Sequence, residues 1–264
     1  MTLQELLTSL TRDLHAAGTD APALEARLLA GHVLHLDRIG LMLAMPSPVA
    51  DDAAAAIRAL TARRCAGEPL AHITGRREFF GRDFEVSPQT LIPRPETEQL
   101  AEAAIDYLRK RPECRVLELC GGSGCIAITV AKTLPAANVT VLELSPEAME
   151  YLRANMARHK ADNVTAVQGD ALCPPPTIQG PYDAILSNPP YIASGELPTL
   201  QREVRREPAM ALDGGTDGLD FYRGFNDIYP RMLAPGGLLL YEIGEEQGEA
   251  VAALLRNAGL ERVA

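Results

Sequence analysis

Apolar residues recur at helical spacing over the first 64 residues of the chain. Residues three and four apart share one face of an α-helix, so such spacing indicates an amphipathic helix. One apolar stripe consists of Leu3, Leu6, Leu7, Leu10 and Leu14, and a second of Leu24, Leu28, Leu29 and Val33. Ile57 and Leu60 mark a third helix after Pro46. The pattern predicts a small helical domain over residues 1–64, whose stripes form its core and which can recognise a partner.

The pattern changes between residues 65 and 92. The stretch 65–69 breaks the helical spacing, and apolar residues at 78–80 and 84–86 flank Gly81-Arg82-Asp83. Two short apolar runs around a turn predict a β-hairpin, which we interpret as a linker. Pro93 and Pro95 then hold an extended approach to a helix running to about Arg109. This approach leads into the remainder of the chain, so we expect it to form a wall of the active-site cleft.

From residue 113 onward, apolar strands alternate with helices. Strands are predicted at 115–119, 138–144, 163–168, 182–186 and 238–243, with helices at 125–134 and 146–159 between the first three. Strands that alternate with helices predict a parallel, doubly wound sheet with right-handed crossovers, in a domain over residues 93–264. Ligands of such sheets bind at the carboxyl ends of the strands.

A glycine-rich loop follows the first of these strands. Gly122-Ser123-Gly124-Cys125-Ile126-Ala127 fits the pattern G-x-G-x-x-G/A, and Glu143 ends the next strand, where a carboxylate accepts from ribose hydroxyls. These features alone indicate a nucleoside cofactor, either NAD or S-adenosylmethionine (SAM). Glu118 can bind an ammonium group, which NAD lacks, and Asp170 can accept from an adenine amine. The combination favours SAM.

The fourth strand leads into Asn188-Pro189-Pro190-Tyr191. Prolines fix the backbone and leave carbonyl oxygens as acceptors, and the Asn188 side-chain oxygen is a further acceptor. Two adjacent acceptors suit the two hydrogens of a planar NH2 group, and Tyr191 offers an aromatic face. The loop therefore predicts a site for a carboxamide or for the exocyclic amine of a base.

Composition narrows the class of protein. The chain has 264 residues and a net charge of −10, which argues against a broad nucleic-acid surface. Its five cysteines have no C-x-x-C spacing, which indicates reduced thiols in a cytoplasmic protein and no zinc site. The first residues have no signal-peptide pattern, and no apolar run reaches the roughly 18 residues of a membrane span.

Together these motifs resemble a known family. Glu118 to Gly124, Glu143, Asp170 and Asn188 to Tyr191 resemble the class I SAM-dependent methyltransferases, which have a Rossmann-like, mostly parallel sheet and modify planar NH2 groups. The stretches 91–98, 207–208 and 211–219, with the helical front domain, are similar to the PrmC (HemK) family. Its members are protein-(glutamine-N5) methyltransferases that act on peptide-chain release factors.

The resemblance implies a cofactor, a substrate and residues for each. SAM is the implied cofactor, with S-adenosylhomocysteine as product, and the glutamine of a Gly-Gly-Gln loop is the implied target. The helical domain would dock the release factor, and neither a membrane nor direct nucleic-acid binding is expected. The implied cofactor residues are Glu118, Cys120, Gly121, Gly122, Ser123, Gly124, Glu143, Asp170, Ala171 and Asn188. The implied substrate residues are Asn188, Pro189, Pro190, Tyr191, Arg94 and Thr97, of which Asn188, Pro189 and Tyr191 would be catalytic.

Some positions depart from the family pattern, and other functions stay open. The family usually has glycine where Cys120 stands, so a positive φ there would crowd the methionine end of SAM. Glu143 replaces a common aspartate. Family members continue beyond residues 261–264 into a final antiparallel strand pair, so we expect an open sheet edge. The alternatives are an adenine-N6 nucleic-acid methyltransferase, a glutamine methyltransferase of a ribosomal protein, and a non-catalytic SAM-binding protein.

Overall fold

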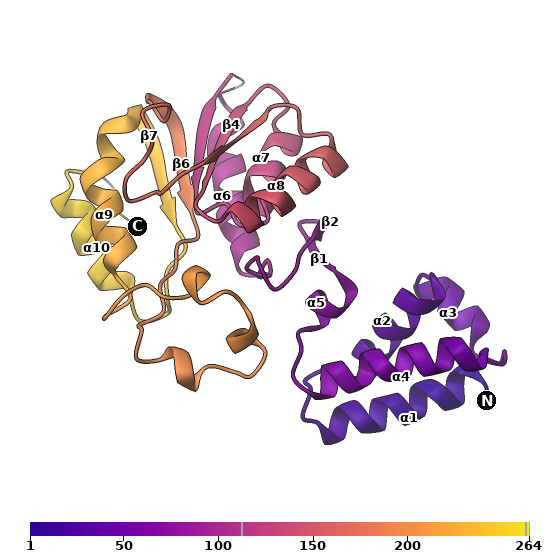
Figure 1. Cartoon of the computed structure of the whole chain (residues 1–264). Helices are drawn as coiled ribbons and strands as arrows, with labels where there is room; N and C mark the ends of the chain where they lie inside the picture. Colours follow the sequence, from indigo (N-terminus) through magenta and orange to yellow (C-terminus); the bar gives the residue numbers. More distant parts are fainter. Residues whose placement is uncertain (112, 262, 264) are drawn as a thin grey trace. The chain divides into compact units, whose positions relative to one another are not determined.

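The computed structural model describes residues 1–111, 113–261 and 263, and its contacts divide the chain into two units (Figure 1). The helical unit contains residues 1–75 and 201–206, and the α/β unit contains 76–200 and the described part of 207–264. The stretch 65–92, interpreted above as a linker, is thus divided: residues up to Gly75 belong to the helical unit, and the hairpin belongs to the α/β unit.

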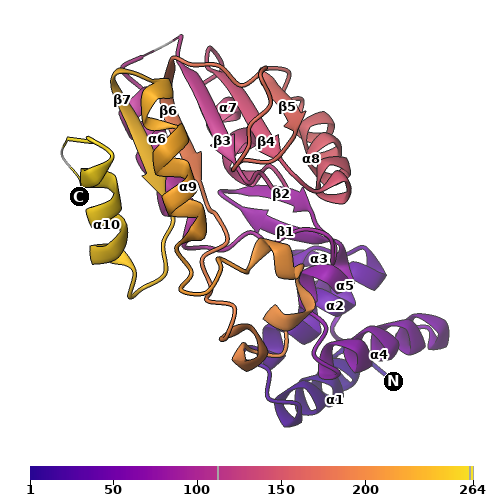
Figure 2. The ribbon, with the colours of Figure 1, turned by 60° about the vertical axis from the view of Figure 1, so that its left-hand side comes forward.

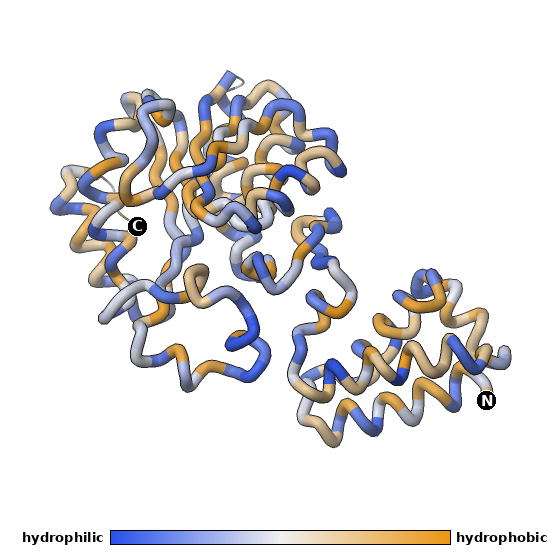
Figure 3. Tube along the Cα trace, viewed as in Figure 1, coloured by the Kyte–Doolittle hydropathy of each residue, from blue (hydrophilic) through white to orange (hydrophobic). Residues whose placement is uncertain are grey.

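The helical unit is built on α1 (Leu3–Ala16), α2 (Pro22–Leu34), α3 (Arg38–Ala44), α4 (Asp51–Cys65) and the short α5 (Leu70–Thr74). Helix α1 begins with a reciprocal cap, in which Thr2 and Glu5 each accept the other's backbone amide hydrogen. The first predicted stripe is buried as expected. Figure 3 shows apolar and polar positions alternating along α1.

The second predicted stripe is partly wrong. Leu24 and Leu28 are 55% and 46% exposed, whereas Ala26, Leu29 and Ala30 of the same helix are buried. Helix α2 carries apolar residues around most of its circumference, so spacing alone did not identify the face that packs against α1 and α4.

Residues 201–206, which are far from residues 1–75 in the sequence, also belong to the helical unit. Arg64 forms salt bridges with Glu25 of α2 at 2.8 Å and with Glu203 at 2.7 Å, and only 8% of its side chain is exposed. Arg202 and Arg206 donate to the carbonyl oxygens of residues 65 and 66 at 2.9 and 3.0 Å. Residues 201–206 are therefore held by the end of α4 and the turn after it.

The α/β unit contains a two-stranded hairpin and a five-stranded parallel sheet. The hairpin pairs β1 (Arg76–Phe79) with β2 (Arg82–Glu85). The sheet has the order β5-β4-β3-β6-β7, and the same strands are visible in Figure 2. Its strands are β3 (Arg115–Leu119), β4 (Asn138–Glu143), β5 (Val164–Gln168), β6 (Tyr182–Ser187) and β7 (Leu233–Tyr241).

Helices cover both faces of this sheet. They are α6 (Thr97–Leu108), α7 (Cys125–Thr133), α8 (Pro146–His159), α9 (Asp220–Ile228) and α10 (Gly248–Asn257). The α/β unit also has 3₁₀ turns at Leu197–Thr199, Ala209–Ala211 and Pro230–Met232, and the 3₁₀ turn Val204–Arg206 belongs to the helical unit. Helices α6, α7 and α8 share one core with the hairpin phenylalanines Phe79 and Phe84. Helix α9 packs on the other face through Phe225. Successive strand residues such as Ile185 and Leu186 point into different cores, as the pleat requires.

The observed elements agree closely with the predicted α/β pattern, and the predicted fold class is confirmed. Strand β7 differs, because it begins at Leu233 rather than near Leu238. Its pairing with β6 shifts in register between Tyr182 and Ala184, where Pro235, Gly236 and Gly237 bulge out of the strand. Among the described residues, no helix has both the length and the apolar character needed to cross a membrane.

Candidate active site

All five parallel strands present their carboxyl ends at one edge of the sheet, and a cleft opens there. The cleft has about 670 Å³ of free space, including its solvent-open mouth. Several residues singled out by the sequence line it, namely Cys120, Gly122, Glu143, Asp170, Ala171, Asn188 and Pro190. The order of the strands brings together positions that are far apart in the sequence, because Cys120 and Asn188 follow the adjacent strands β3 and β6.

The three glycines of the loop have different roles. A Cβ on Gly121 would lie 2.2 Å from Val141 Cγ1, and one on Gly124 would lie 2.3 Å from Leu152 Cδ1. Both glycines therefore allow close packing against β4 and α8. Gly122 has a φ of 54° and open space where a Cβ would be. Of the three, Gly122 is the one that lines the cleft, so its backbone is available to a ligand.

Glu143 lies at the end of β4, where the sequence predicted a carboxylate. Its Oε2 accepts from the Gly122 amide at 2.7 Å, and its Oε1 accepts from the Ser145 amide at 2.8 Å. Each carboxylate oxygen has two acceptor positions, so each retains capacity for a ligand hydroxyl. The side chain is held in place by the backbone before any ligand binds.

Glu118 is not among the residues that line the cleft. Its side chain is buried below the glycine loop, and its Oε2 accepts from the Ala127 amide at 2.8 Å. Burial raises the pKa of Glu118 well above its ordinary value, and the nearby Glu143 adds to that effect, while the Ala127 amide opposes it. An ammonium group arriving beside this carboxyl would favour its ionised form.

Cys120 has a positive φ, the conformation that the glycine of the family pattern would adopt without strain. Its φ is 59°, in the left-handed region where a side chain is strained. Burial raises the pKa of its thiol, so the thiol stays protonated in the neutral range. Cys120 lines the cleft, and a thiol there occupies space that a glycine would leave open.

Asp170 and Ala171 follow β5 and line the cleft together. Asp170 Oδ1 accepts from the Leu172 amide at 2.8 Å, which shapes the turn and leaves its other oxygen free of that bond. Tyr229 donates to the Ala171 carbonyl at 2.7 Å. The cleft is also lined by the apolar residues Leu142, Leu144, Ala148 and Phe221. Such a wall suits a flat aromatic ring.

The Asn188 side chain is oriented by a hydrogen bond to the start of α6. Its Nδ2 donates to the hydroxyl of Thr97, the first residue of α6, at 3.1 Å. Its Oδ1 is buried and has no hydrogen-bond partner among the described residues. A buried acceptor without a partner is costly, so such an atom in a cleft indicates a position where a ligand donor binds.

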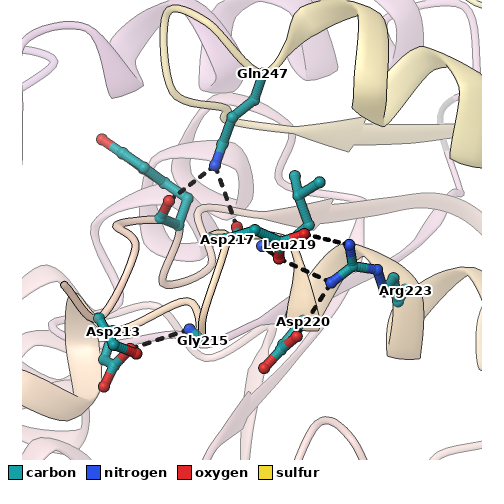
Figure 4. Close-up of polar contacts among 10 residues, drawn as sticks. Asp213, Gly215, Asp217, Leu219, Asp220, Arg223 and Gln247 are labelled. Carbon is teal, nitrogen blue, oxygen red and sulfur yellow. Dashed lines mark hydrogen bonds and ion pairs between the residues drawn. The ribbon is translucent and has the colours of Figure 1, made fainter. Parts of the chain in front are cut away.

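Pro189 and Tyr191 are not among the cleft-lining residues. Tyr191 is held through its backbone, because Gln247 donates to the carbonyl oxygens of Tyr191 and Gly218 at 2.9 and 3.2 Å. Figure 4 shows Gln247 above the loop that contains Asp217 and Leu219. The same loop is closed by a salt bridge of 2.5 Å between Asp217 and Arg223. The segment 211–219 thus packs against the polypeptide that follows Pro190.

Arg94, expected at the substrate site, is engaged by Glu207. Its guanidinium lies 2.5 Å from Glu207 Oε1, and Glu207 Oε2 accepts from the Ile92 amide at 2.9 Å. Only 1% of the Glu207 side chain is exposed. Glu207 therefore fixes the extended stretch before α6 to the segment that follows residue 206.

Two residues of the site were not found from the sequence. Asn155 of α8 is fully buried and donates to the carbonyl oxygens of Ser123 and Glu85 at 2.9 and 3.0 Å, so it anchors the glycine loop to the hairpin. Glu242 follows β7 and lies beside Thr97 and Asn188. A polar residue inside a helix gives no distinct signal, whereas an acidic residue at the end of the strand next to β6 could have been considered.

The order of the strands in the sheet, and the cleft at their carboxyl ends, are those of a class I SAM-dependent methyltransferase. Similarity to solved structures agrees at the level of fold: a methyltransferase from Pyrococcus furiosus has a TM-score of 0.50 at 21% identity, over 76% of this chain and 87% of that one. A SAM-dependent methyltransferase from Agrobacterium tumefaciens has a TM-score of 0.50 at 18% identity, over 69% and 57%.

Sequence relatives identify the family. Residues 5–75 match the PrmC N-terminal domain, and residues 97–215 match the methyltransferase small domain. The release factor glutamine methyltransferase of Moorella thermoacetica is 41% identical over 99% of this chain and 92% of its own length. That of Bordetella pertussis is 44% identical over 97% and 93%. The chain belongs to the release factor glutamine methyltransferase family, as the sequence motifs predicted.

Proposed function

We propose that this enzyme transfers the methyl group of SAM to the side-chain nitrogen of the glutamine in the Gly-Gly-Gln loop of a peptide-chain release factor, with S-adenosylhomocysteine and one proton of that amide as the other products. The observation that carries the proposal is the buried Oδ1 of Asn188 at the cleft, which has no hydrogen-bond partner in the part of the chain that the structure describes. Names of relatives that match nearly the whole chain support the choice of glutamine and release factor.

In this proposal, the loops at the strand ends hold SAM. Glu143 accepts from the ribose hydroxyls, Asp170 accepts from the adenine amine, and the apolar wall with Phe221 encloses the ring. The backbone at Gly121, Gly122, Ser123 and Gly124 passes along the amino-acid end, where Glu118 meets the ammonium group. Bound SAM supplies a methyl group attached to a positively charged sulfur.

The Asn188 loop prepares the substrate nitrogen. An amide nitrogen is a weak nucleophile because its lone pair is delocalised into the carbonyl group. Asn188 Oδ1 and the Pro189 carbonyl oxygen accept its two hydrogens, which turns the nitrogen toward the methyl group and increases its electron density. Tyr191 packs on the amide plane and, with Pro190, helps to exclude water. Fixing the two reactants in this way can supply up to about 7–11 kcal/mol.

The remaining predicted residues have supporting roles in this proposal. Thr97 orients Asn188 through its hydroxyl group, and Arg94 with Glu207 fixes the wall that leads to α6. The helical unit, residues 1–75 and 201–206, docks the release factor, and the reaction takes place in the cytoplasm, where translation ends. The net charge of −10 weighs against a nucleic-acid substrate, which would need a basic groove.

The distribution of a labelled methyl group tests the proposal. Methyl-labelled SAM is incubated with the enzyme and, in parallel reactions, with a release factor, ribosomal proteins, DNA and RNA. We expect label on the release factor alone. Label on nucleic acid would favour the adenine-N6 alternative, label on a ribosomal protein would favour that relative, and SAM binding without transfer to any of them would favour a binding protein.

A further inference from the structure

Two buried oxygen atoms near the end of the sheet lack hydrogen-bond partners in the described part of the chain, Asn188 Oδ1 and Glu242 Oε2. They belong to neighbouring strand ends, since β6 leads into Asn188 and β7 leads into Glu242. The proposed function gives Asn188 Oδ1 a partner in the substrate amide. It leaves the buried carboxylate of Glu242 without a role.

The backbone at Glu242 is fixed from both sides. Its amide donates to the Ser187 carbonyl at 2.9 Å, which continues the pairing of β7 with β6 by one residue. Its carbonyl oxygen accepts from the hydroxyl of Tyr222 in α9 at 2.8 Å. Because Ser187 immediately precedes Asn188, these bonds hold Glu242 beside the loop that is proposed to bind the substrate.

The side chains of Thr97 and Asn188 lie next to this carboxylate and interact with it. The Thr97 hydroxyl oxygen already accepts from Asn188 Nδ2 at 3.1 Å, so its hydrogen is free to be donated elsewhere. A chain of donors can therefore run from the Asn188 amide to the Thr97 hydroxyl and on to the Glu242 carboxylate. Such a chain permits only one orientation of the Asn188 amide, with Nδ2 toward Thr97 and Oδ1 toward the cleft.

We propose that Glu242 is a positioning residue for methyl transfer: its ionised carboxylate, acting through the Thr97 hydroxyl and on the Asn188 amide directly, holds Asn188 Oδ1 toward the substrate amide. The inference rests on the proposed function, because it gives Asn188 Oδ1 the substrate nitrogen as its partner. Glu242 itself touches neither substrate nor cofactor.

Protonation of Glu242 would reverse this arrangement. Burial raises the pKa of Glu242 and Glu96 adds to that, while Thr97, Asn188 and Arg94 oppose it. A protonated carboxyl is a donor, which can bond to Asn188 Oδ1 and compete with the substrate. Activity should therefore fall as the pH falls through the raised pKa of Glu242. Among the described residues, the other titratable groups that interact with Glu242 are Tyr191, whose side chain hydrogen-bonds to it, Tyr222 and Cys125. Burial raises the pKa of each, so they stay neutral in this range.

The test compares Glu242→Gln with the wild-type enzyme and with Glu245→Gln, which makes the same change at an exposed glutamate three residues further on. The rate at which a release factor is methylated is measured as a function of pH, and the dissociation constant of SAM is measured for each variant. We expect Glu242→Gln to lower kcat about tenfold or more at neutral pH and to remove the acid limb of the profile. SAM binding should change less than about twofold, and Glu245→Gln should match the wild type. Wild-type kcat or an unchanged acid limb in Glu242→Gln would overturn the inference.

Variants of Thr97 provide an independent check. Thr97→Val keeps the shape of the side chain and removes the hydroxyl, so it should reproduce the loss in Glu242→Gln, and the double variant should be no worse than either single one. Thr97→Ser should restore most of the activity. Losses that multiply in the double variant would contradict a shared chain of hydrogen bonds.

An NMR titration separates this inference from the proposed function, because it needs no turnover. The side-chain amide signals of Asn188 are followed against pH in the wild type and in Glu242→Gln. The inference predicts that they shift with the ionisation of Glu242 in the wild type and lose that shift in the variant. Signals that do not respond to pH in the wild type would overturn it, whether or not the enzyme methylates a release factor.

Discussion

The backbone amide of Gly122 donates to the Glu143 carboxylate over 2.7 Å. This contact joins the cleft-lining glycine of the loop after β3 to the end of β4, the adjacent strand. The acceptor proposed for the cofactor ribose and the backbone proposed for its amino-acid end are therefore fixed relative to each other. A site organised before binding loses less entropy when the cofactor enters.

Replacing Glu143 tests this arrangement. Glu143→Gln retains one acceptor oxygen and places an NH2 group against either the Gly122 or the Ser145 amide, where two donors face each other. Loss of a charge-assisted hydrogen bond costs about 1.5–3 kcal/mol, so SAM should bind about 10–100 times more weakly. Isothermal titration calorimetry measures the change, with the exposed Glu150→Gln of α8 as the matched control. Equal affinity in both variants would exclude Glu143 from the cofactor site.

Replacing Glu118 with glutamine should raise the stability of the fold and weaken the binding of SAM. Its folded pKa lies above its ordinary value of 4.5, so the folded state is favoured while the group is protonated and loses that advantage as the pH rises through the raised pKa. Glu118→Gln cannot ionise and can keep the bond from Ala127. The stability of the variant relative to the wild type should therefore increase from about pH 4.5 upward.

Denaturant unfolding across this pH range checks the stability effect, and calorimetry at neutral pH checks SAM binding. We expect the variant to be at least as stable as the wild type and to bind SAM more weakly, since it has no carboxylate for the ammonium group. A stability difference that does not vary with pH would contradict the raised pKa, and unchanged SAM binding would contradict the proposed contact.

Cys120 permits a measurement of backbone strain. Its φ of 59° costs an ordinary residue about 1–2 kcal/mol and glycine little. Cys120→Ala and Cys120→Gly both remove the thiol, and they differ in whether a Cβ remains. The glycine variant should be the more stable of the two by about 1 kcal/mol in urea unfolding. An alanine variant as stable as the glycine variant would show that the loop relaxes to accommodate a side chain.

Arg64 should control the attachment of residues 201–206 to the helical unit. Arg64→Ala leaves the largely buried Glu25 uncompensated and removes the contact to Glu203, at a cost of about 3–5 kcal/mol. Trypsin should then cut faster at Arg202, Arg205 and Arg206. The control is Arg63→Ala, whose side chain is 47% exposed and pairs with Glu68, so its loss should cost less than about 1 kcal/mol. Equal cleavage rates in the two variants would contradict the anchoring role of Arg64.

Local patterns predicted much of this structure because they act over short distances. The spacing of apolar residues located β3 to β6 within one or two residues, and Ser145-Pro146 located the start of α8. The glycine loop, Glu143, Asp170 and Asn188 were found because each follows a strand, and parallel strands bring their ends together.

The features that could not be predicted from the sequence depend on contacts between distant segments of the chain. Residues 201–206 belong to the helical unit through Arg64, which lies more than 130 positions earlier in the sequence. The burial of Glu118 and the exposure of Leu24 and Leu28 depend on which face packs, and apolar spacing does not distinguish the faces of a helix that is apolar almost all round. The role proposed for Glu242 depends on the adjacency of β6 and β7.

The location of the transferred methyl group tests the proposed function most directly. Wild-type enzyme and Asn188→Ala are incubated with SAM and a release factor, and peptide mass spectrometry locates any modification. We expect methylation of the Gly-Gly-Gln glutamine by the wild type, and a loss of transfer in Asn188→Ala while SAM binding persists. A methyl group on any other residue, or unchanged turnover in Asn188→Ala, would contradict it.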